Sequence, residues 1–502
     1  MLLWFVIAYW IVSVGIGLYA ATRVHTAKDF AVAGRHLPFY MVTATVFATW
    51  FGSETVLGIP ATFLKEGLHG VVADPFGSSL CLILVGLFFA APLYRMNLLT
   101  IGDFYKKRFG RGAEVMTTIA IVISYLGWVG AQITALGLVF NVVSDGAISK
   151  QAGMWIGSST ILIYTLFGGM WAVAITDLLQ MIVIVIGMLW IGGEVSGMAG
   201  GVGVVVDHAA RNGAFNFWPA PDAREIIGFT AAWITMMFGS IPQQDVFQRV
   251  QSSRTEKIAI WGSVLGGSLY FLFAFVPMFL AYSATLIDAD MVGRLIDTDP
   301  QMILPRLVME KAPLIAQVMF FGALLSAIKS CASATLLAPS VTFTENLLKP
   351  MLSGPGRTMS DRRLLLYMRI VTLVFTLLVT LYALNSKYSI FKMVENAYQI
   401  TLVTAFVPLV CGLYWRRATN QGALVAIFFG VTTWLSILAA SPGDPFIPAQ
   451  FAGLIAAIIG MIAGSLLPQV VHHDPHVHDQ LRSGHHAAAV THHVAEPVHH
   501  HH

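Results

Sequence analysis

Long apolar segments recur along the chain up to residue 468, separated by short polar stretches. A helix needs about 20 mostly apolar residues to cross a bilayer. The pattern predicts thirteen transmembrane helices, at 2–22, 38–62, 70–95, 112–144, 150–169, 173–197, 224–246, 257–284, 313–347, 364–385, 391–416, 421–440 and 447–468. An odd number of helices places the two termini on opposite sides of the membrane.

Composition agrees with this pattern. Hydrophobic residues make up 56% of the chain and charged residues 11%, and the mean hydropathy is +0.73. A soluble protein carries about 25% charged residues, so most of this surface is expected to face lipid. The net charge of +3 is too small for nucleic-acid binding. The three cysteines are far apart and form neither a metal motif nor a disulfide framework.

Lysine and arginine are distributed unevenly between the loops. One alternate set of loops holds seventeen of them and the other set eight. The richer set is expected to be cytoplasmic, which places the N-terminus outside and the C-terminus inside. The first apolar segment begins at Leu2 without a preceding basic region, so we interpret it as a permanent helix. We expect a multi-pass protein of a bacterial-type inner membrane.

The composition changes after Pro468. Twelve of the sixteen histidines fall between His472 and His502. A histidine-rich tract can bind metal, but a disordered cytoplasmic tail over 469–502 is the simpler interpretation. Residues 1–468 then form the membrane domain.

Polar residues interrupt two of the predicted helices. ATWFGSE (48–54) breaks the second and GSIPQQD (239–245) breaks the seventh, five helices later. Ordinary glycine or proline kinks account for either break alone, but paired breaks are typical of transporters with inverted repeats. The predicted fold is all-α, with a five-plus-five inverted repeat whose first helices are discontinuous. The repeats cover 38–197 and 224–416, preceded by helix 2–22 and followed by two helices in 421–468.

Further polar groups lie in other apolar segments. Ala327, Ser330 and Cys331 share one helical face, where oxygen atoms suit sodium better than sulfur does. Small polar residues also serve as helix-packing contacts. Asp177 is a lone intramembrane carboxylate, and Lys329 is the lysine set deepest in an apolar segment. The two are a candidate pair, unless Lys329 extends toward the membrane interface.

Six stretches in order resemble the sodium:solute symporter family over residues 1–468. They are FATWFGSETVLGIP (47–60), LTIGDFYKKRFG (99–110), YTLFGGMWAVAITDLLQ (164–180), IPQQDVFQR (241–249), SAIKSCASATLL (326–337) and GLYWRRATNQGAL (412–424). The resemblance implies the leucine-transporter type of fold, with one helix before the repeats and two after them.

The resemblance also implies ion sites. The main sodium site of the family corresponds here to Ala48, Phe51, Ala327, Ser330 and Cys331. The last position usually carries a hydroxyl, so its thiol removes one hard ligand.

Some members have a second sodium site near the Asp177 position, completed by hydroxyls that match Ser330, Ser333 and Ala334. Alanine cannot serve as such a ligand. We hypothesise that Lys329 neutralises Asp177 there and replaces the second ion, or carries a transported proton.

The stretches ATWFG (48–52), SSLCLILVGLFFAAPLYR (78–95) and LGWVGAQ (126–132) are most similar to the choline transporter branch of this family. The resemblance implies a site in which aromatic rings hold a quaternary ammonium ion by cation–π attraction. Trp50 and Trp128 match two positions of that cage, whereas Gln243 stands where a third tryptophan is expected. The candidate polar contacts to the solute are Ser53, Glu54, Gln132, Gln243, Gln244 and Asp245.

Together these features predict a secondary transporter that couples a small polar solute, such as an amine, a quaternary ammonium compound or an amino acid, to sodium or protons. The coupling ion takes the place of a cofactor. A solute sensor that binds without transport is the alternative. The chain lacks the HExxH, GxSxG and P-loop patterns, which argues against an enzyme. No filter-like repeat indicates a channel.

Overall fold

The computed structural model describes residues 1–354, 358–441 and 443–471. Regular structure in these ranges is helical, apart from one isolated β-bridge between Leu37 and Ser253. The predicted all-α class is confirmed. The predicted histidine-rich tail lies outside the described residues from position 472 onward.

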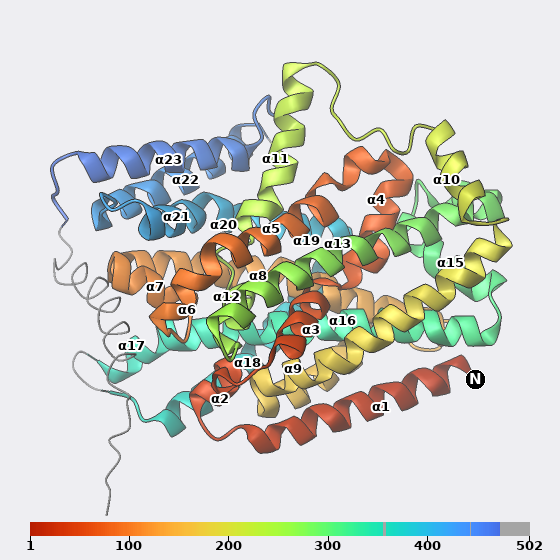
Figure 1. Cartoon of the computed structure of the whole chain (residues 1–502), viewed down its shortest axis with the longest axis horizontal. Coiled ribbons are helices and arrows are strands. Elements are labelled where there is room, and N and C mark those ends of the chain that lie inside the picture. The colour runs from red at the N-terminus through yellow and green to blue at the C-terminus, as the bar shows by residue number, and fades with distance from the viewer. Residues whose placement is uncertain (355–357, 442, 472–502) are drawn as a thin grey trace, which may run out of the picture.

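Long helices form a bundle and lie roughly along its longest direction (Figure 1). They are α1 (Leu2–Ala20), α8 (Arg111–Val143), α9 (Lys150–Met198), α13 (Glu256–Ile287), α16 (Leu314–Phe343), α18 (Asp361–Asn385), α22 (Asn420–Ala440) and α23 (Ala449–Leu466). In the described part of the chain, nine helical segments are long and apolar enough to cross a membrane, or up to eleven if each of two bent pairs is one span. The chain is therefore a multi-span membrane protein.

Other segments that the sequence predicts as single helices are divided. The first break separates α3 (Phe39–Trp50) from the π-helix η3 (Glu54–Gly58) and α4 (Ile59–Glu66). The second bends α11 (Ala223–Gly239) against α12 (Gln244–Ser252) by 43°. Both breaks coincide with the polar interruptions in the sequence. The remaining divided segments are η4 (Leu68–Val71), η5 (Val72–Gly77), α5 (Ser78–Leu84), η6 (Val85–Phe89) and α6 (Ala90–Met96), and then α19 (Ile390–Ala397), α20 (Gln399–Thr404) and α21 (Phe406–Tyr414).

The 49 residues of α9 contain a sharp kink. Gly169 has φ 50° and ψ −138°, a backbone conformation that favours glycine. A side chain at this position would collide with Phe30, which packs against the kink. The kink lies between the predicted helices 150–169 and 173–197.

Short helices complete the chain between the long ones. They are η1 (Ala21–Arg23), α2 (Ala27–Val32), η2 (Ala33–Arg35), α7 (Ile101–Arg108), α10 (Val202–Arg211), α14 (Ala289–Leu295), η7 (Pro300–Met302), α15 (Ile303–Lys311), η8 (Thr344–Leu348) and α17 (Lys349–Ser353). A Thr100–Asp103 capping box starts α7.

Helix α16 is the centre of the bundle. Every residue from 323 to 342 is buried, so all faces of this helix contact protein. Many of these residues are alanine, serine or threonine, whose small side chains let neighbouring helices approach closely. By contrast, α1 and the α22–α23 pair lie at opposite edges (Figure 1), and α1 buries only one stripe of residues. The candidate polar residues therefore lie on the central elements.

Candidate functional site

The break after α3 exposes backbone polar groups in the middle of the bundle. Phe51 leaves the helical conformation at φ −83° and ψ 79°, which interrupts the helical hydrogen-bond pattern. The amide N–H of Ser53 donates to the Oε1 of Gln132 on α8 at 2.9 Å. A side chain from another helix thus provides a hydrogen-bond acceptor for a backbone N–H of the broken segment. Carbonyl oxygens near the break can face an ion.

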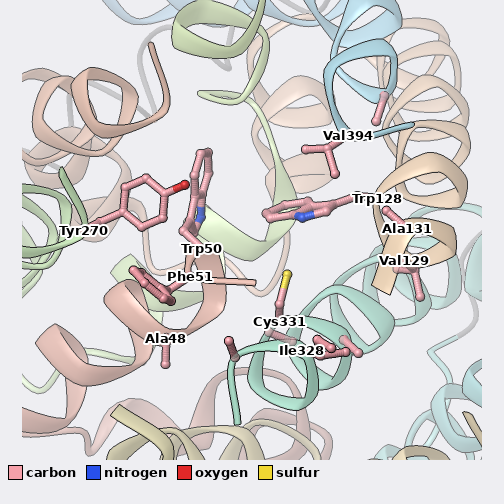
Figure 2. Close-up of a cluster of buried hydrophobic side chains, with 14 of the residues drawn as sticks. Ala48, Trp50, Phe51, Trp128, Val129, Ala131, Tyr270, Ile328, Cys331 and Val394 are labelled. Atoms are coloured by element: carbon pink, nitrogen blue, oxygen red, sulfur yellow. The ribbon is translucent and has the colours of Figure 1, made fainter. Parts of the chain in front are cut away.

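Helix α16 contacts this break through Ser330. The hydroxyl of Ser330 donates to the carbonyl oxygen of Ala48 at 2.7 Å and lies 3.0 Å from the carbonyl oxygen of Ala327. Cys331 follows on the same helix and is fully buried. Figure 2 shows its sulfur pointing into the space between the rings of Trp50 and Trp128. The structure therefore brings the residues of the predicted sodium site together.

Glu54 lies beside this group. Its Oε2 accepts a hydrogen bond from the Nε2 of Gln132 at 2.7 Å. A Cβ atom placed on Gly52 would be 2.7 Å from that oxygen and 2.8 Å from the Sγ of Cys331. Only glycine leaves room here for both atoms. The indole of Trp128 is adjacent to both the carboxylate and the thiol.

Four aromatic rings form a cluster next to the break. The centroid of Trp128 is 5.4 Å from that of Trp50, 5.5 Å from that of Tyr398 and 6.0 Å from that of Tyr125. Trp50 and Tyr398 stack at 6.3 Å. The rings come from α3, α8 and the junction of α19 with α20. We call these four residues the aromatic cage.

A carboxylate lies at the edge of the aromatic cage. The Nε1 of Trp50 donates to the Oδ2 of Asp245 at 3.1 Å, and the hydroxyl of Tyr125 hydrogen-bonds with its Oδ1. The backbone N–H of Asp245 also donates to the Tyr125 hydroxyl at 2.8 Å. The second broken helix thus places an acid directly against rings from α3 and α8.

Sequence reasoning missed two members of the cage. Tyr125 precedes Trp128 by one helical turn, a spacing that could have indicated a shared face. Tyr398 gave a weaker signal, the polar stretch ENAYQ (395–399) within an apolar segment. Gln243, at the position where a third tryptophan was expected, instead bonds Ser124 and Thr401.

Gln244 lies outside the cage as well. Its Oε1 accepts a hydrogen bond from the backbone N–H of Ile101 at 2.8 Å, at the start of α7. Of the predicted polar contacts to the solute, Asp245 alone hydrogen-bonds the cage rings, whereas Ser53, Glu54 and Gln132 connect to one another.

A buried guanidinium accompanies the acids. Arg249, which falls in the loop between the predicted helices 224–246 and 257–284, lies in α12 and is 2% exposed. Its Nη1 donates to the backbone oxygen of Asp245 at 3.1 Å, and its charge acts on both Asp245 and Asp177. The bent helix α12 continues past the predicted end of its segment at 246, which is why the loop interpretation was wrong.

The expected pairing of Asp177 with Lys329 is not observed. Asp177 accepts a hydrogen bond from the Thr45 hydroxyl at 2.7 Å, and no ion pair within 4.0 Å joins it to Lys329. The Nζ of Lys329 lies 5.0 Å from the ring centroid of Trp10 and 5.5 Å from that of Tyr164. Consecutive residues on a helix point about 100° apart, so Ser330 faces α3 while Lys329 faces α1 and α9.

Ser333 completes the predicted second ion site. Its hydroxyl donates to the backbone oxygen of Ser330 at 3.2 Å, one turn earlier on α16. It therefore bonds within its own helix and makes no hydrogen bond to Lys329 or Asp177, so the structure does not join these three residues directly.

A cavity of about 780 Å³ opens at one end of the bundle. Residues from α4, η4, α11 and α19 line it, and it reaches Gly58 of η3 and Phe391. Gly58 belongs to the same π-helix as Glu54. The cavity therefore approaches the site from this end.

The opposite end, around α7, is closed by polar contacts. Asn346 donates from Nδ2 to the Oδ1 of Asp103 and to the Oε2 of Glu114, each at 2.9 Å. Burial raises the pKa of Asp103, because desolvation disfavours its charged form. Burial likewise lowers the pKa of Arg108 to about 10, and its guanidinium caps the backbone oxygens of Gly412 and Ala418.

Comparison with known proteins is consistent with this geometry. A model of the sodium:solute symporter family matches residues 30–430. The high affinity choline transporter 1 of Homo sapiens is 26% identical over 470 residues, covering 89% of this chain and 77% of that protein. The sodium/pantothenate symporter of Escherichia coli is 25% identical over 479 residues, covering 92% and 96%.

Solved structures share the fold. A Na⁺-coupled sialic acid symporter in a substrate-bound outward-open state has a TM-score of 0.80 at 19% identity, covering 94% of this chain and 99% of that one. A nucleobase-cation-symport-1 family transporter in a closed conformation has a TM-score of 0.55 at 15% identity, covering 86% and 93%.

Proposed function

Because the chain belongs to the sodium:solute symporter family, whose members couple solute transport to sodium, we propose that its own solute is a small organic cation. An amine or a quaternary ammonium compound fits this description. The observation that carries the proposal is the convergence of Trp50, Trp128 and Tyr398 around Asp245.

The aromatic cage suits a cation chemically. The face of an aromatic ring attracts a cation by about 0.5–1 kcal/mol at exposed sites and about 2 kcal/mol or more when water is excluded. A quaternary ammonium ion has no N–H to donate, so ring faces suit it better than hydrogen-bond acceptors do. Trp50, Trp128 and Tyr398 are each at most 2% exposed, which excludes water from the cage. The relation to a choline transporter supports the same class of solute.

The balance of buried charge supports the proposal independently. Away from the α7 end, the described residues bury four carboxylates and two cations: Glu54, Asp74, Asp177, Asp245, Arg249 and Lys329. With all six ionised, two negative charges remain. Buried charges are costly unless compensated. One sodium ion and one organic monocation would neutralise this excess, whereas one sodium ion and a zwitterionic amino acid would leave one charge.

We assign the sodium ion to the carbonyl oxygens of Ala48, Phe51 and Ala327 and to the hydroxyl of Ser330. This assignment is supported by the hydrogen bond from the Ser330 hydroxyl to the carbonyl oxygen of Ala48 near the break, and by its contact with the carbonyl oxygen of Ala327 on its own helix. Lys329 is proposed as a fixed charge on the α1 side of α16. Its buried ammonium lies 5.0 Å from the ring centroid of Trp10 and donates no hydrogen bond to any of the described residues.

The membrane arrangement is proposed from the sequence. Thirteen spans in a five-plus-five inverted repeat follow if α9 is divided at Gly169 and each broken helix is one span. The excess of basic residues in alternate loops supports an outside N-terminus and a cytoplasmic C-terminus in an inner membrane. With that orientation the 780 Å³ cavity faces outward and the α7 end faces the cytoplasm.

Uptake into proteoliposomes tests the solute class. Labelled choline, a primary amine and a neutral amino acid would each be offered with an inward sodium gradient, and with potassium replacing sodium as the control. We expect accumulation of an organic cation that Trp50→Ala abolishes and Trp218→Ala, at a 73% exposed position, leaves intact. Sodium-driven accumulation of the amino acid alone would refute the proposal.

A further inference from the structure

We propose that the carboxylate of Glu54 is a direct ligand of the sodium ion and compensates for the sulfur at Cys331. The inference rests on the sodium site assigned above and is independent of which solute is carried. It moves Glu54 from the group of predicted solute contacts to the ion site.

The position of Glu54 is the first argument. Its Oε2 and the Sγ of Cys331 both lie against the α-carbon of Gly52, at 2.7 Å and 2.8 Å from where a Cβ would be. Cys331 adjoins Ser330, whose hydroxyl contacts the carbonyl oxygen of Ala48. The carboxylate therefore reaches the same side of the break as the oxygens of the proposed site.

Ligand chemistry is the second argument. Sodium is a hard cation and prefers oxygen, whereas a thiol is a soft and weak donor. Without Glu54, the set consists of neutral carbonyl oxygens, one hydroxyl and a sulfur atom. A carboxylate supplies both a hard oxygen and a full negative charge, which is effective in a site that is shielded from water. Glu54 is 2% exposed.

The orientation of Glu54 is fixed by its neighbours. The Oε1 of Gln132 accepts the Ser53 N–H, so the amide group of Gln132 presents its Nε2 to Glu54. One side chain thereby connects the broken backbone, the carboxylate and α8. Such support holds an ion ligand in place before the ion arrives.

The sodium ion and the organic cation would then bind to separate carboxylates. Asp245 is held by Trp50 and Tyr125 at the edge of the aromatic cage. Glu54 makes no hydrogen bond to either of those two residues and instead adjoins Cys331. Trp128 lies between the two groups, in contact with the cage rings and adjacent to the Glu54 carboxylate. Glu54 thus binds the sodium ion, and Asp245 binds the organic cation.

Sodium titration of the purified full chain tests this assignment without any solute. Thermal unfolding would be followed as NaCl replaces KCl at constant ionic strength, for wild type, Glu54→Gln, Cys331→Ser and the double variant. Asp74→Asn is the matched control, because it removes the charge of a buried carboxylate bonded to Ser78 and Tyr270.

We expect Glu54→Gln to weaken sodium binding at least tenfold, which corresponds to about 1.4 kcal/mol. Asp74→Asn should change it by less than about threefold, a shift of under 1 kcal/mol on the same scale. Adding Cys331→Ser to Glu54→Gln should recover most of the affinity, because the new hydroxyl supplies the missing hard ligand.

Three results would overturn the proposal. Glu54→Gln could titrate like wild type, it could resemble Asp74→Asn, or Cys331→Ser could fail to rescue it. If Glu54→Gln does not fold, Glu54→Asp keeps the charge but withdraws it by one methylene, and unchanged sodium affinity in that variant would count against Glu54. A wild type without any sodium-dependent stabilisation would contradict the sodium site itself. Failure of the solute proposal would show only in the uptake assay.

Discussion

Tyr398 offers a sharp test of the aromatic cage, because sequence reasoning did not include it. Its ring stacks on Trp50 at 6.3 Å and meets Trp128 edge-on at 5.5 Å. Its buried hydroxyl has no hydrogen-bond partner among the described residues. If Tyr398 contributes to solute binding, the ring face is responsible and the hydroxyl is dispensable.

Two substitutions separate these roles. Tyr398→Phe keeps the ring and removes the hydroxyl, whereas Tyr398→Leu keeps apolar bulk and removes the π-system. Loss of one cation–π contact is worth about 0.5–2 kcal/mol, which corresponds to a roughly 2- to 30-fold rise in KM for a quaternary ammonium solute. We expect Tyr398→Phe to remain near wild type and Tyr398→Leu to show this rise.

The assay is initial-rate uptake of labelled choline into proteoliposomes under a fixed sodium gradient. Thermal unfolding of both variants is measured alongside, because replacing a buried aromatic residue can cost about 3 kcal/mol of stability through packing alone. If both variants raise KM equally while remaining folded, the hydroxyl rather than the ring is responsible. Unchanged KM in Tyr398→Leu would remove Tyr398 from the cage.

Other substitutions probe the acid, the serine and the lysine. Asp245→Asn should weaken binding of an organic cation by about 2 kcal/mol or more, because it removes the anionic partner, and unchanged uptake kinetics would contradict this. Ser330→Ala should weaken the sodium dependence of uptake, since it deletes one oxygen 2.7 Å from the carbonyl oxygen of Ala48; an identical sodium activation curve would argue against the site. Lys329→Met should keep or raise the unfolding temperature, because it replaces a buried ammonium by an apolar chain of similar length, while transport falls. A destabilised variant with normal uptake would contradict the fixed-charge role.

Much of the architecture could be predicted because membrane helices are specified locally. An apolar segment of about 20 residues crosses a bilayer irrespective of its partners. The polar stretches at 48–54 and 239–245 likewise marked both breaks, since exposed backbone in lipid is tolerated only where protein or water satisfies it. The boundary of α12 was harder to predict, because Arg249 resembles a loop cation until tertiary contacts show it buried.

The aromatic cage illustrates what sequence reasoning lacked. Trp50 and Trp128 were identified from the family resemblance, and the structure places their centroids 5.4 Å apart. Tyr398 lies more than 250 residues from Trp128 in sequence, at a junction between two short helices. Its approach depends on how α19 packs against α8, which no local pattern reports. Although Gln243 stands where a third tryptophan was expected, the ring of Tyr398 therefore completes the cage.

Lys329 was paired with Asp177 because both are charged residues in apolar segments, and a helical wheel could not have tested that pairing. The wheel gives the angle between two residues of one helix but not the direction in which the helix faces. Ser330 turned toward the break, and Lys329 consequently turned toward Trp10 and Tyr164. Arg249, on a different helix, provides the charge that acts on Asp177 instead.

The position of Arg249 bears on how many ions accompany each solute. Its guanidinium acts on Asp177 and Asp245 together, so Asp177 already has a fixed positive charge nearby. A second sodium ion near Asp177 would have to share that carboxylate with a fixed positive charge. The guanidinium would repel that sodium ion, and the repulsion is strong because both charges lie in a medium of low dielectric constant. The site would therefore attract the ion much less. Together with the alanine at position 334, this favours one sodium ion per organic cation. If all six buried groups are ionised, the two positive charges of the sodium ion and the organic cation would match the two negative charges that remain in the core.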